Sequence, residues 1–117
     1  MDERELVSPE EIDGLVSKHR WFWLQLLKAG PNRDQDEATV EQLQLAHLQH
    51  LWSLQRRGLL TLFGPVDDSE LRGIGVVLVE TREEAEALFA EDPMVKVGRL
   101  VVEIRPWFTM PGAALPE

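Results

Sequence analysis

Two histidines in the middle of a predicted helix are the residues of this chain best suited to acid–base chemistry. His47 and His50 lie three positions apart, and residues at that spacing reach the same side of a helix. Imidazole gains and loses a proton near neutral pH, so either side chain could serve as a general acid or base. The apolar stripe that contains both histidines consists of Val40, Leu43, His47, His50, Leu51 and Leu54.

The two histidines have other interpretations. Each could be a core or edge residue whose ring is satisfied by a hydrogen bond and takes no part in chemistry. A metal pair is the least favoured interpretation, because His-x-x-His supplies only two ligands and no third ligand follows at a recognisable spacing. We therefore predict no metal site. The chain also lacks a glycine-rich phosphate loop, so we predict no bound cofactor.

Four further residues are candidates for the same site. Asp92, directly before Pro93 at the end of a predicted helix, could orient an imidazole and fix its tautomer; a plain helix stop is the alternative. Gly64 and Pro65 end a predicted strand, where the glycine allows a bulge or the close approach of a ligand. Trp107 could form the wall of a pocket for a planar ligand, although burial in the core or an interface is the favoured interpretation.

The composition favours a single cytoplasmic domain. The chain has 117 residues, no cysteine and a formal net charge of -9. Without cysteine there is no disulfide, thiolate metal site or cysteine nucleophile. The Lys and Arg residues are scattered, which argues against nucleic-acid binding. No apolar run approaches the roughly 18 residues of a membrane helix, and the acidic N-terminus does not resemble a signal peptide.

Hydrophobic periodicity and turn signals predict the order β-α-β-β-α-β. Strands are expected at residues 20–28, 59–66, 73–80 and 99–106, and helices at 39–57 and 82–91. We assign residues 20–108 to one α+β domain of ferredoxin-like order, with a four-stranded antiparallel sheet and both helices on one face. Residues 1–19 are an extension with an extra short helix after Ser8, and residues 109–117 are an irregular tail.

The face of the sheet without helices is expected to be covered. Residues 21–27 and 74–79 place apolar side chains on both faces of their strands, whereas a strand with one solvated face alternates apolar and polar residues. A second subunit's sheet is the favoured cover, which predicts a homodimer with stacked sheets. The N-terminal helix folding over this face is the alternative.

Three stretches carry a resemblance to a known family. They are KAGPN after the first strand, AHLQHLWSLQRRGLLTLFGPV, and GIGVVLVETREEAEALFAEDPMVKVGRLVVEIRPW. With these stretches the chain resembles the YCII-related (YciI-like) proteins of the dimeric α/β-barrel superfamily over about residues 20–108. The resemblance implies a ferredoxin-like subunit, two sheets packed face to face, and a cleft with a His–Asp dyad.

The resemblance assigns roles by position. The histidine of AHL and the aspartate of DP are His47 and Asp92, His50 is a second candidate, and Gly64 and Pro65 would line the cleft. The extension before residue 20 is absent from compact members of the family, and residues 67–72 give no cue to specificity.

The leading hypothesis for function is a cofactor-free acid–base enzyme that acts on a small molecule. Its reaction would resemble that of a lyase, a dehydrochlorinase or an isomerase. One alternative is a non-catalytic module for small-molecule binding or dimerisation. The other is a cofactor-independent monooxygenase, which occurs in this superfamily.

Overall fold

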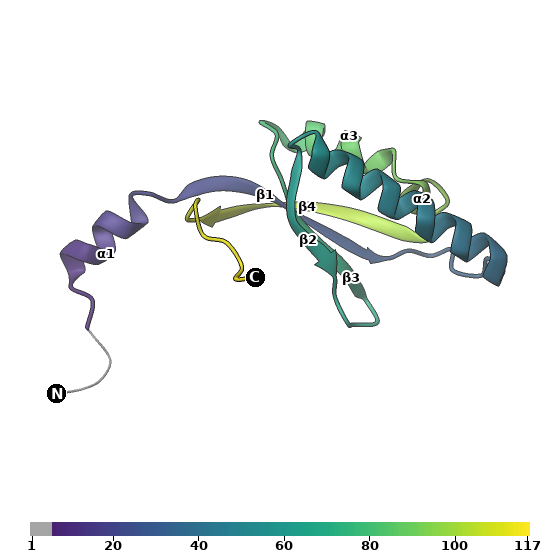
Figure 1. Cartoon of the computed structure of the whole chain (residues 1–117), viewed down its shortest axis with the longest axis horizontal. Coiled ribbons are helices and arrows are strands. Elements are labelled where there is room, and N and C mark those ends of the chain that lie inside the picture. Colours follow the sequence, from purple (N-terminus) through teal and green to yellow (C-terminus); the bar gives the residue numbers. More distant parts are fainter. Residues whose placement is uncertain (1–5) are drawn as a thin grey trace.

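Four strands form one antiparallel sheet in the computed structural model, which describes residues 6–117 (Figure 1). The strands are β1 (Arg20–Ala29), β2 (Leu60–Pro65), β3 (Leu71–Val77) and β4 (Leu100–Thr109), and their order across the sheet is β2-β3-β1-β4. A helical connection follows β1 and another follows β3, as in the ferredoxin-like plan. The predicted α+β fold class is therefore confirmed.

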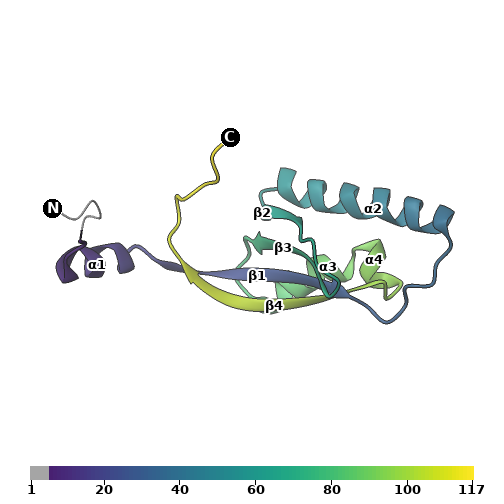
Figure 2. The same ribbon diagram turned by 90° about the horizontal axis from the view of Figure 1, so that it is seen from below.

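Three helices belong to the sheet domain: α2 (Glu37–Arg56), α3 (Arg82–Ala90) and the single turn α4 (Pro93–Lys96). Figure 2 shows α2 as a layer beside the strands. Asp36 begins α2 by accepting a hydrogen bond from the Thr39 amide at 2.8 Å, and Thr81 begins α3 in the same way with the Glu84 amide at 3.1 Å. Side-chain oxygens at these positions satisfy amides that a helix cannot pair internally.

The core lies between the helices and one face of the sheet. Leu54 of α2 and Phe89 of α3 are 1% and 0% exposed, and they pack with Leu60, Val77 and Ile104 of the strands. Both helices therefore contribute to the same buried cluster. Because successive strand residues alternate between faces, the neighbours of Val77 and Ile104 along each strand point to the opposite side.

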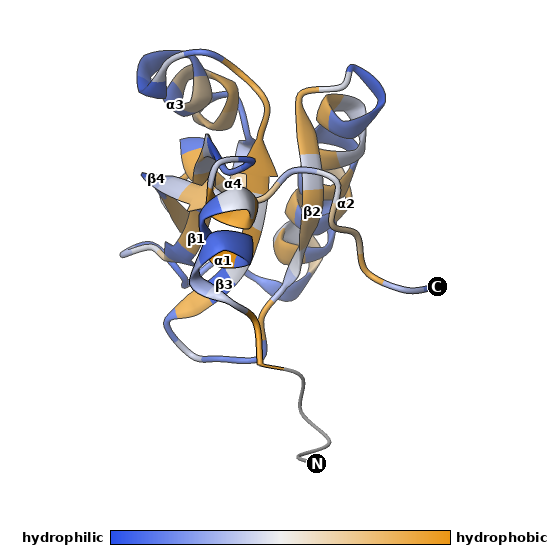
Figure 3. Cartoon of the chain, turned by 90° about the vertical axis from the view of Figure 1, so that its left-hand side faces the viewer, coloured by the Kyte–Doolittle hydropathy of each residue, from blue (hydrophilic) through white to orange (hydrophobic). Residues whose placement is uncertain are grey.

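That opposite side carries many apolar residues. In register, Phe22 of β1 lies beside Trp107 of β4, and Leu24 and Leu26 lie beside Val76 and Ile74 of β3. In Figure 3, orange segments, which mark hydrophobic residues, recur along the strands. A smaller polar group of Lys28, Glu103 and Arg105 shares the face, with Glu103 bridging the two cations.

The N-terminal helix α1 (Pro9–Val16) does not cover this face. Ser8 begins α1 by accepting a hydrogen bond from the Glu11 amide at 3.1 Å, as the sequence predicts. No residue of α1 is buried, and Figures 1 and 2 show the helix beyond the start of β1, away from α2 and α3. In the structure, α1 therefore does not fold over the sheet, and the alternative prediction for this helix is wrong. Among residues 6–117, no helix has the length and apolar character needed to cross a bilayer.

The largest differences from the predicted strand limits are at β3 and β4. β4 continues to Thr109, past Pro106, because β4 is an edge strand, in which a residue without an N–H is tolerated. β3 ends at Val77, and residues 78–80 lead out of the sheet to α3. In β2 the pairing register shifts between Thr61 and Gly64, and Leu62 has a positive φ of 47°. The irregularity in strand pairing therefore lies just before Gly64, where the sequence allowed a bulge.

Gly30 fixes the loop after β1 against the start of β4. Its amide donates to the Arg99 carbonyl at 2.8 Å, and the Asn32 amide donates to the Gly98 carbonyl at 3.0 Å. A Cβ on Gly30 would lie only 2.2 Å from the Gly98 carbonyl oxygen. Only a glycine therefore allows this approach of two backbones.

We expect Gly30→Ala to lower the free energy of unfolding by about 1–3 kcal/mol, the usual cost of overpacking. Urea denaturation measures the change. Gly14→Ala is the control, because a Cβ there meets nothing within 4 Å. Equal stability of the Gly30 variant and the wild type would show that the two segments separate without cost.

Candidate active site

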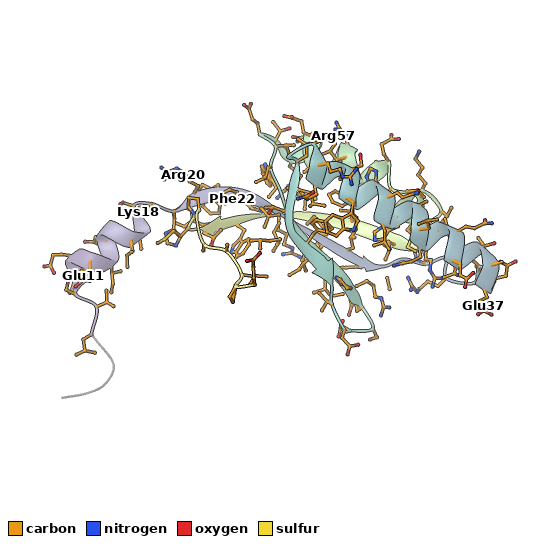
Figure 4. The ribbon with its side chains drawn as sticks, viewed as in Figure 1. Glu11, Lys18, Arg20, Phe22, Glu37 and Arg57 are labelled. Atoms are coloured by element: carbon orange, nitrogen blue, oxygen red, sulfur yellow. The ribbon has the colours of Figure 1, made fainter. Side chains whose placement is uncertain are left out.

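A cavity of about 320 Å³ lies between α2 and the sheet. Gln25 and Leu27 of β1 line it on the sheet side, and Met94 of α4 also lines it. Figure 4 shows α2 with its side chains, from Glu37 at one end to Arg57 at the other. The residues that α2 contributes to the lining are Val40, Gln44, His47, Leu48, Leu51 and Trp52.

His47 and Asp92 form a buried pair beside this cavity. The His47 Nδ1 atom lies 2.6 Å from Asp92 Oδ2, across 45 positions of sequence. His47 is 8% exposed and Asp92 is 0% exposed. A carboxylate only accepts hydrogen bonds, so Nδ1–H is the donor, and in the neutral ring Nε2 is then the acceptor. Within residues 6–117, no group hydrogen-bonds to Nε2, and His47 lines the cavity.

Asp92 is positioned by the corner between α3 and α4. Its second oxygen, Oδ1, accepts from the Met94 amide at 2.9 Å, so Asp92 is the N-cap of α4. The sequence interpretation of a helix stop at the end of α3 is therefore incomplete, because the carboxylate also begins the next helix. The two oxygens have separate partners, which fixes the orientation of the carboxylate toward His47.

His50 does not line the cavity. Its Nε2–H donates to the Leu88 carbonyl at 2.8 Å, and its ring meets the Phe89 ring edge-on with centroids 6.4 Å apart. Side chains three residues apart differ by about 300° around the helix axis, so the His50 side chain points about 60° away from that of His47, toward α3. This is the arrangement of a histidine satisfied by a hydrogen bond. The predicted role in substrate binding has no support from this position.

The other predicted residues divide between the two faces of the sheet. Gly64 and Pro65 line the cavity that His47 lines. Trp107 does not, because it is three residues from the helix-facing Ile104 and so points to the opposite face, in register with Phe22. It lies on the open face of the sheet and away from the His47 cavity.

Gln25 is a cavity residue that the sequence analysis missed. It is 1% exposed, and its Oε1 is buried with no hydrogen-bond partner among the residues described. Gly75 makes room for it, since a Cβ there would lie 2.8 Å from Gln25 Nε2. The available signal was a single amide in the apolar strand WFWLQLL, because a polar residue buried in such a strand requires a partner.

In the part of the chain from residue 6 onward, no cluster of three or more His, Asp or Glu side chains is arranged to bind a metal ion. The arrangement beside the cavity instead provides one imidazole oriented by one carboxylate. Such a pair can remove a proton from a bound molecule and return it.

Comparisons with known proteins place the chain in a family. None of the curated proteins compared with it matches. Among solved structures, it is similar to 5-chloro-2-hydroxyhydroquinone dehydrochlorinase from Burkholderia phenoliruptrix AC1100, in complex with 2,5-dihydroxybenzoquinone. That likeness has 22% identity and a TM-score of 0.49, and covers 72% of this chain and 92% of the other. The sequence matches the YCII-related domain over residues 22–108. This match spans most of the chain, which therefore belongs to the family of YCII-related domain proteins.

Proposed function

We propose that this protein is a cofactor-free acid–base enzyme in which His47 transfers a proton to or from a small molecule. One observation carries the proposal: a buried imidazole whose Nδ1 lies 2.6 Å from the Asp92 carboxylate, at the wall of a cavity. Asp92 is also held by the Met94 amide. The catalytic pair is thus fixed before a substrate arrives, as efficient proton transfer requires.

The reaction class follows from what Nε2 can do. Its lone pair accepts a proton from a carbon next to a carbonyl, while Asp92 stabilises the imidazolium that forms. In an elimination, the electrons of the broken C–H bond form a C=C bond, and the leaving group departs with its own bonding pair. In an isomerisation, the imidazolium returns the proton at another atom. We therefore propose a lyase-like or isomerase-like reaction.

The cavity suits a molecule with an apolar body. Leu48 and Leu51 of α2 line it, and Trp52 of α2 packs edge-on against Phe63 of β2 with ring centroids 4.9 Å apart. Cavities of a few hundred cubic ångströms that are lined mainly by apolar and aromatic side chains are typical of small-molecule sites. Gly64 and Pro65 of β2 line the cavity and would contact the substrate there.

Proton exchange with solvent tests this proposal without knowledge of the final product. The wild-type protein is incubated in D₂O with a panel of enolisable cyclic ketones and hydroxyquinones, and deuterium at carbon is measured by NMR. We expect incorporation above the buffer rate for at least one compound that binds. Binding without deuterium exchange would contradict the proposed enzymatic function and support the alternative of a non-catalytic binding module.

We also propose that two copies pair through their sheets. The open face carries Phe22, Leu24 and Leu26, and Trp107 on it is 40% exposed. Contiguous apolar side chains on an exposed face often mark a protein–protein interface. A homodimer would cover this face, and a cytoplasmic location remains the expectation from the cysteine-free composition.

We expect Leu24→Asp to convert the dimer to monomers, because a charge would be buried without a partner at the interface. Sedimentation velocity measures the change. Leu45→Asp is the matched control, since Leu45 is 60% exposed on α2 and lies off the sheet. A wild-type protein that sediments as a monomer would contradict the pairing.

A further inference from the structure

Three arginines line the cavity beside His47. Arg33 comes from the loop after β1, Arg72 from the start of β3, and Arg99 from the residue before β4. Arg33 and Arg99 hold each other in place, because the guanidinium of each donates to the backbone carbonyl of the other. Arg99 also donates to Gln35 Oε1 at 3.0 Å. These contacts fix the positions of Arg33 and Arg99, and the Arg72 guanidinium donates to the Asp68 carbonyl.

Within residues 6–117, Arg33 and Arg99 have no carboxylate partner. The pKa of the Asp68 carboxyl, which is near Arg72, is lowered mainly by hydrogen bonds from backbone amides and further by the charge of Arg72. No Asp or Glu is among the residues that line the cavity, and across residues 6–117 none of the three arginines is in a salt bridge. By contrast, Lys28 and Arg105 on the open face both pair with Glu103. The cluster stands out in a chain with 21 acidic and 12 basic residues.

Arg33 is close enough to both Arg99 and Arg72 to be repelled by their charges. Partial desolvation lowers the pKa of Arg33 below its ordinary value, and the charges of Arg99 and Arg72 lower it further, although the Arg33 and Arg72 side chains remain exposed to solvent. Like charges held together cost free energy unless an anion neutralises them. Gln25, whose Oε1 has no partner in the described chain, lines the same cavity and can accept one hydrogen bond from a ligand.

We propose that the cavity binds a small organic carboxylate, whose charged group meets Arg33, Arg72 and Arg99 and whose apolar body packs along α2 toward Trp52. The role of His47 on such an acid rests on the proposed function, whereas the binding does not. Guanidinium groups match carboxylates in shape and charge. A hydroxyl group on the body of the acid would donate to Gln25.

Calorimetric titration with three probes tests the proposal: para-hydroxybenzoate, its neutral analogue para-hydroxybenzamide, and inorganic phosphate. We expect para-hydroxybenzoate to bind at least about 10-fold more tightly than either of the others. Equal affinity for the amide, equal affinity for phosphate, or a Kd of para-hydroxybenzoate above about 10 mM would each overturn it.

Matched variants locate the binding site. Arg72→Gln should weaken binding of para-hydroxybenzoate by about 10-fold, because it removes one charge-assisted contact. Arg57 is the C-cap of α2, labelled in Figure 4, and does not line the cavity. Arg57→Gln should therefore leave the affinity for para-hydroxybenzoate unchanged. Thermal unfolding confirms that both variants fold. Equal effects of the two substitutions would overturn the site.

The same titration on His47→Gln separates this proposal from the enzymatic one. Preference for the carboxylate over the amide should persist in that variant, since His47 does not supply the charge. If the protein prefers the carboxylate but catalyses no proton exchange, the proposed binding site stands and the proposed enzymatic function is refuted. Exchange on neutral compounds without anion preference would do the reverse.

Discussion

Replacement of His47 by glutamine is expected to lower the rate of deuterium exchange at the substrate by about 10²–10⁴-fold, the usual contribution of a positioned acid–base group. Glutamine has a similar reach but takes no proton from carbon. Since His47 is 8% exposed and its pair is buried, circular dichroism and the unfolding midpoint should be measured alongside to confirm that the variant is folded.

His50→Gln is the matched control for this experiment. His50 lies one turn of α2 further along, bonds to the Leu88 carbonyl and does not line the cavity. We expect its exchange rate to stay within a few fold of wild type. A loss of exchange of the same size in both variants would mean that neither histidine is the specific proton-transfer residue. A wild-type exchange rate in folded His47→Gln would refute the assignment of His47 as the acid–base residue.

Asp92→Ala is expected to reduce the free energy of unfolding by about 2–5 kcal/mol, because each buried donor left without an acceptor costs about 1–3 kcal/mol. Asp92 is fully buried, so the substitution leaves both the His47 Nδ1–H and the Met94 amide without an acceptor. Urea denaturation of the two proteins measures the difference. A loss below about 1 kcal/mol, ordinary for a surface change, would contradict this role.

Asp92→Asn separates stability from chemistry. The amide oxygen can still accept from the Met94 amide, so the cap of α4 is retained and the loss of stability should be smaller. The amide has no charge to stabilise an imidazolium, so exchange should still fall by about 10²-fold. Wild-type exchange in Asp92→Asn would show that the carboxylate has only a structural role.

Most of the fold could be predicted from local sequence. Ser8, Asp36 and Thr81 are short polar residues in front of apolar periodic segments. Each is the N-cap of the helix that follows it, and the short helix after Ser8 was expected on this basis. The extent of β4 could not be predicted from Pro106 alone. A proline usually ends a strand, and its tolerance here depends on β4 being at the edge of the sheet.

The site was predictable only in part. The helical period places His47 in the apolar stripe, but its distance from Asp92 depends on the packing of α2 against the corner of α3 and α4, which no local pattern encodes. The resemblance to a family supplied that pairing. Arg33, Arg72 and Arg99 were missed because each looks like a scattered surface charge, and only the sheet register and the Gly30–Gly98 approach bring them together.

In the proposed site, Asp92 holds His47 with its proton on Nδ1, which leaves Nε2 free to accept a proton in the cavity. Long-range ¹H–¹⁵N correlation NMR of the labelled protein reports directly which ring nitrogen of each histidine carries a proton, and His47→Gln assigns the signals. We predict that neutral His47 is protonated at Nδ1, and that this preference is lost in Asp92→Asn. A neutral His47 protonated at Nε2 in the wild type would show that Asp92 does not orient the ring for catalysis.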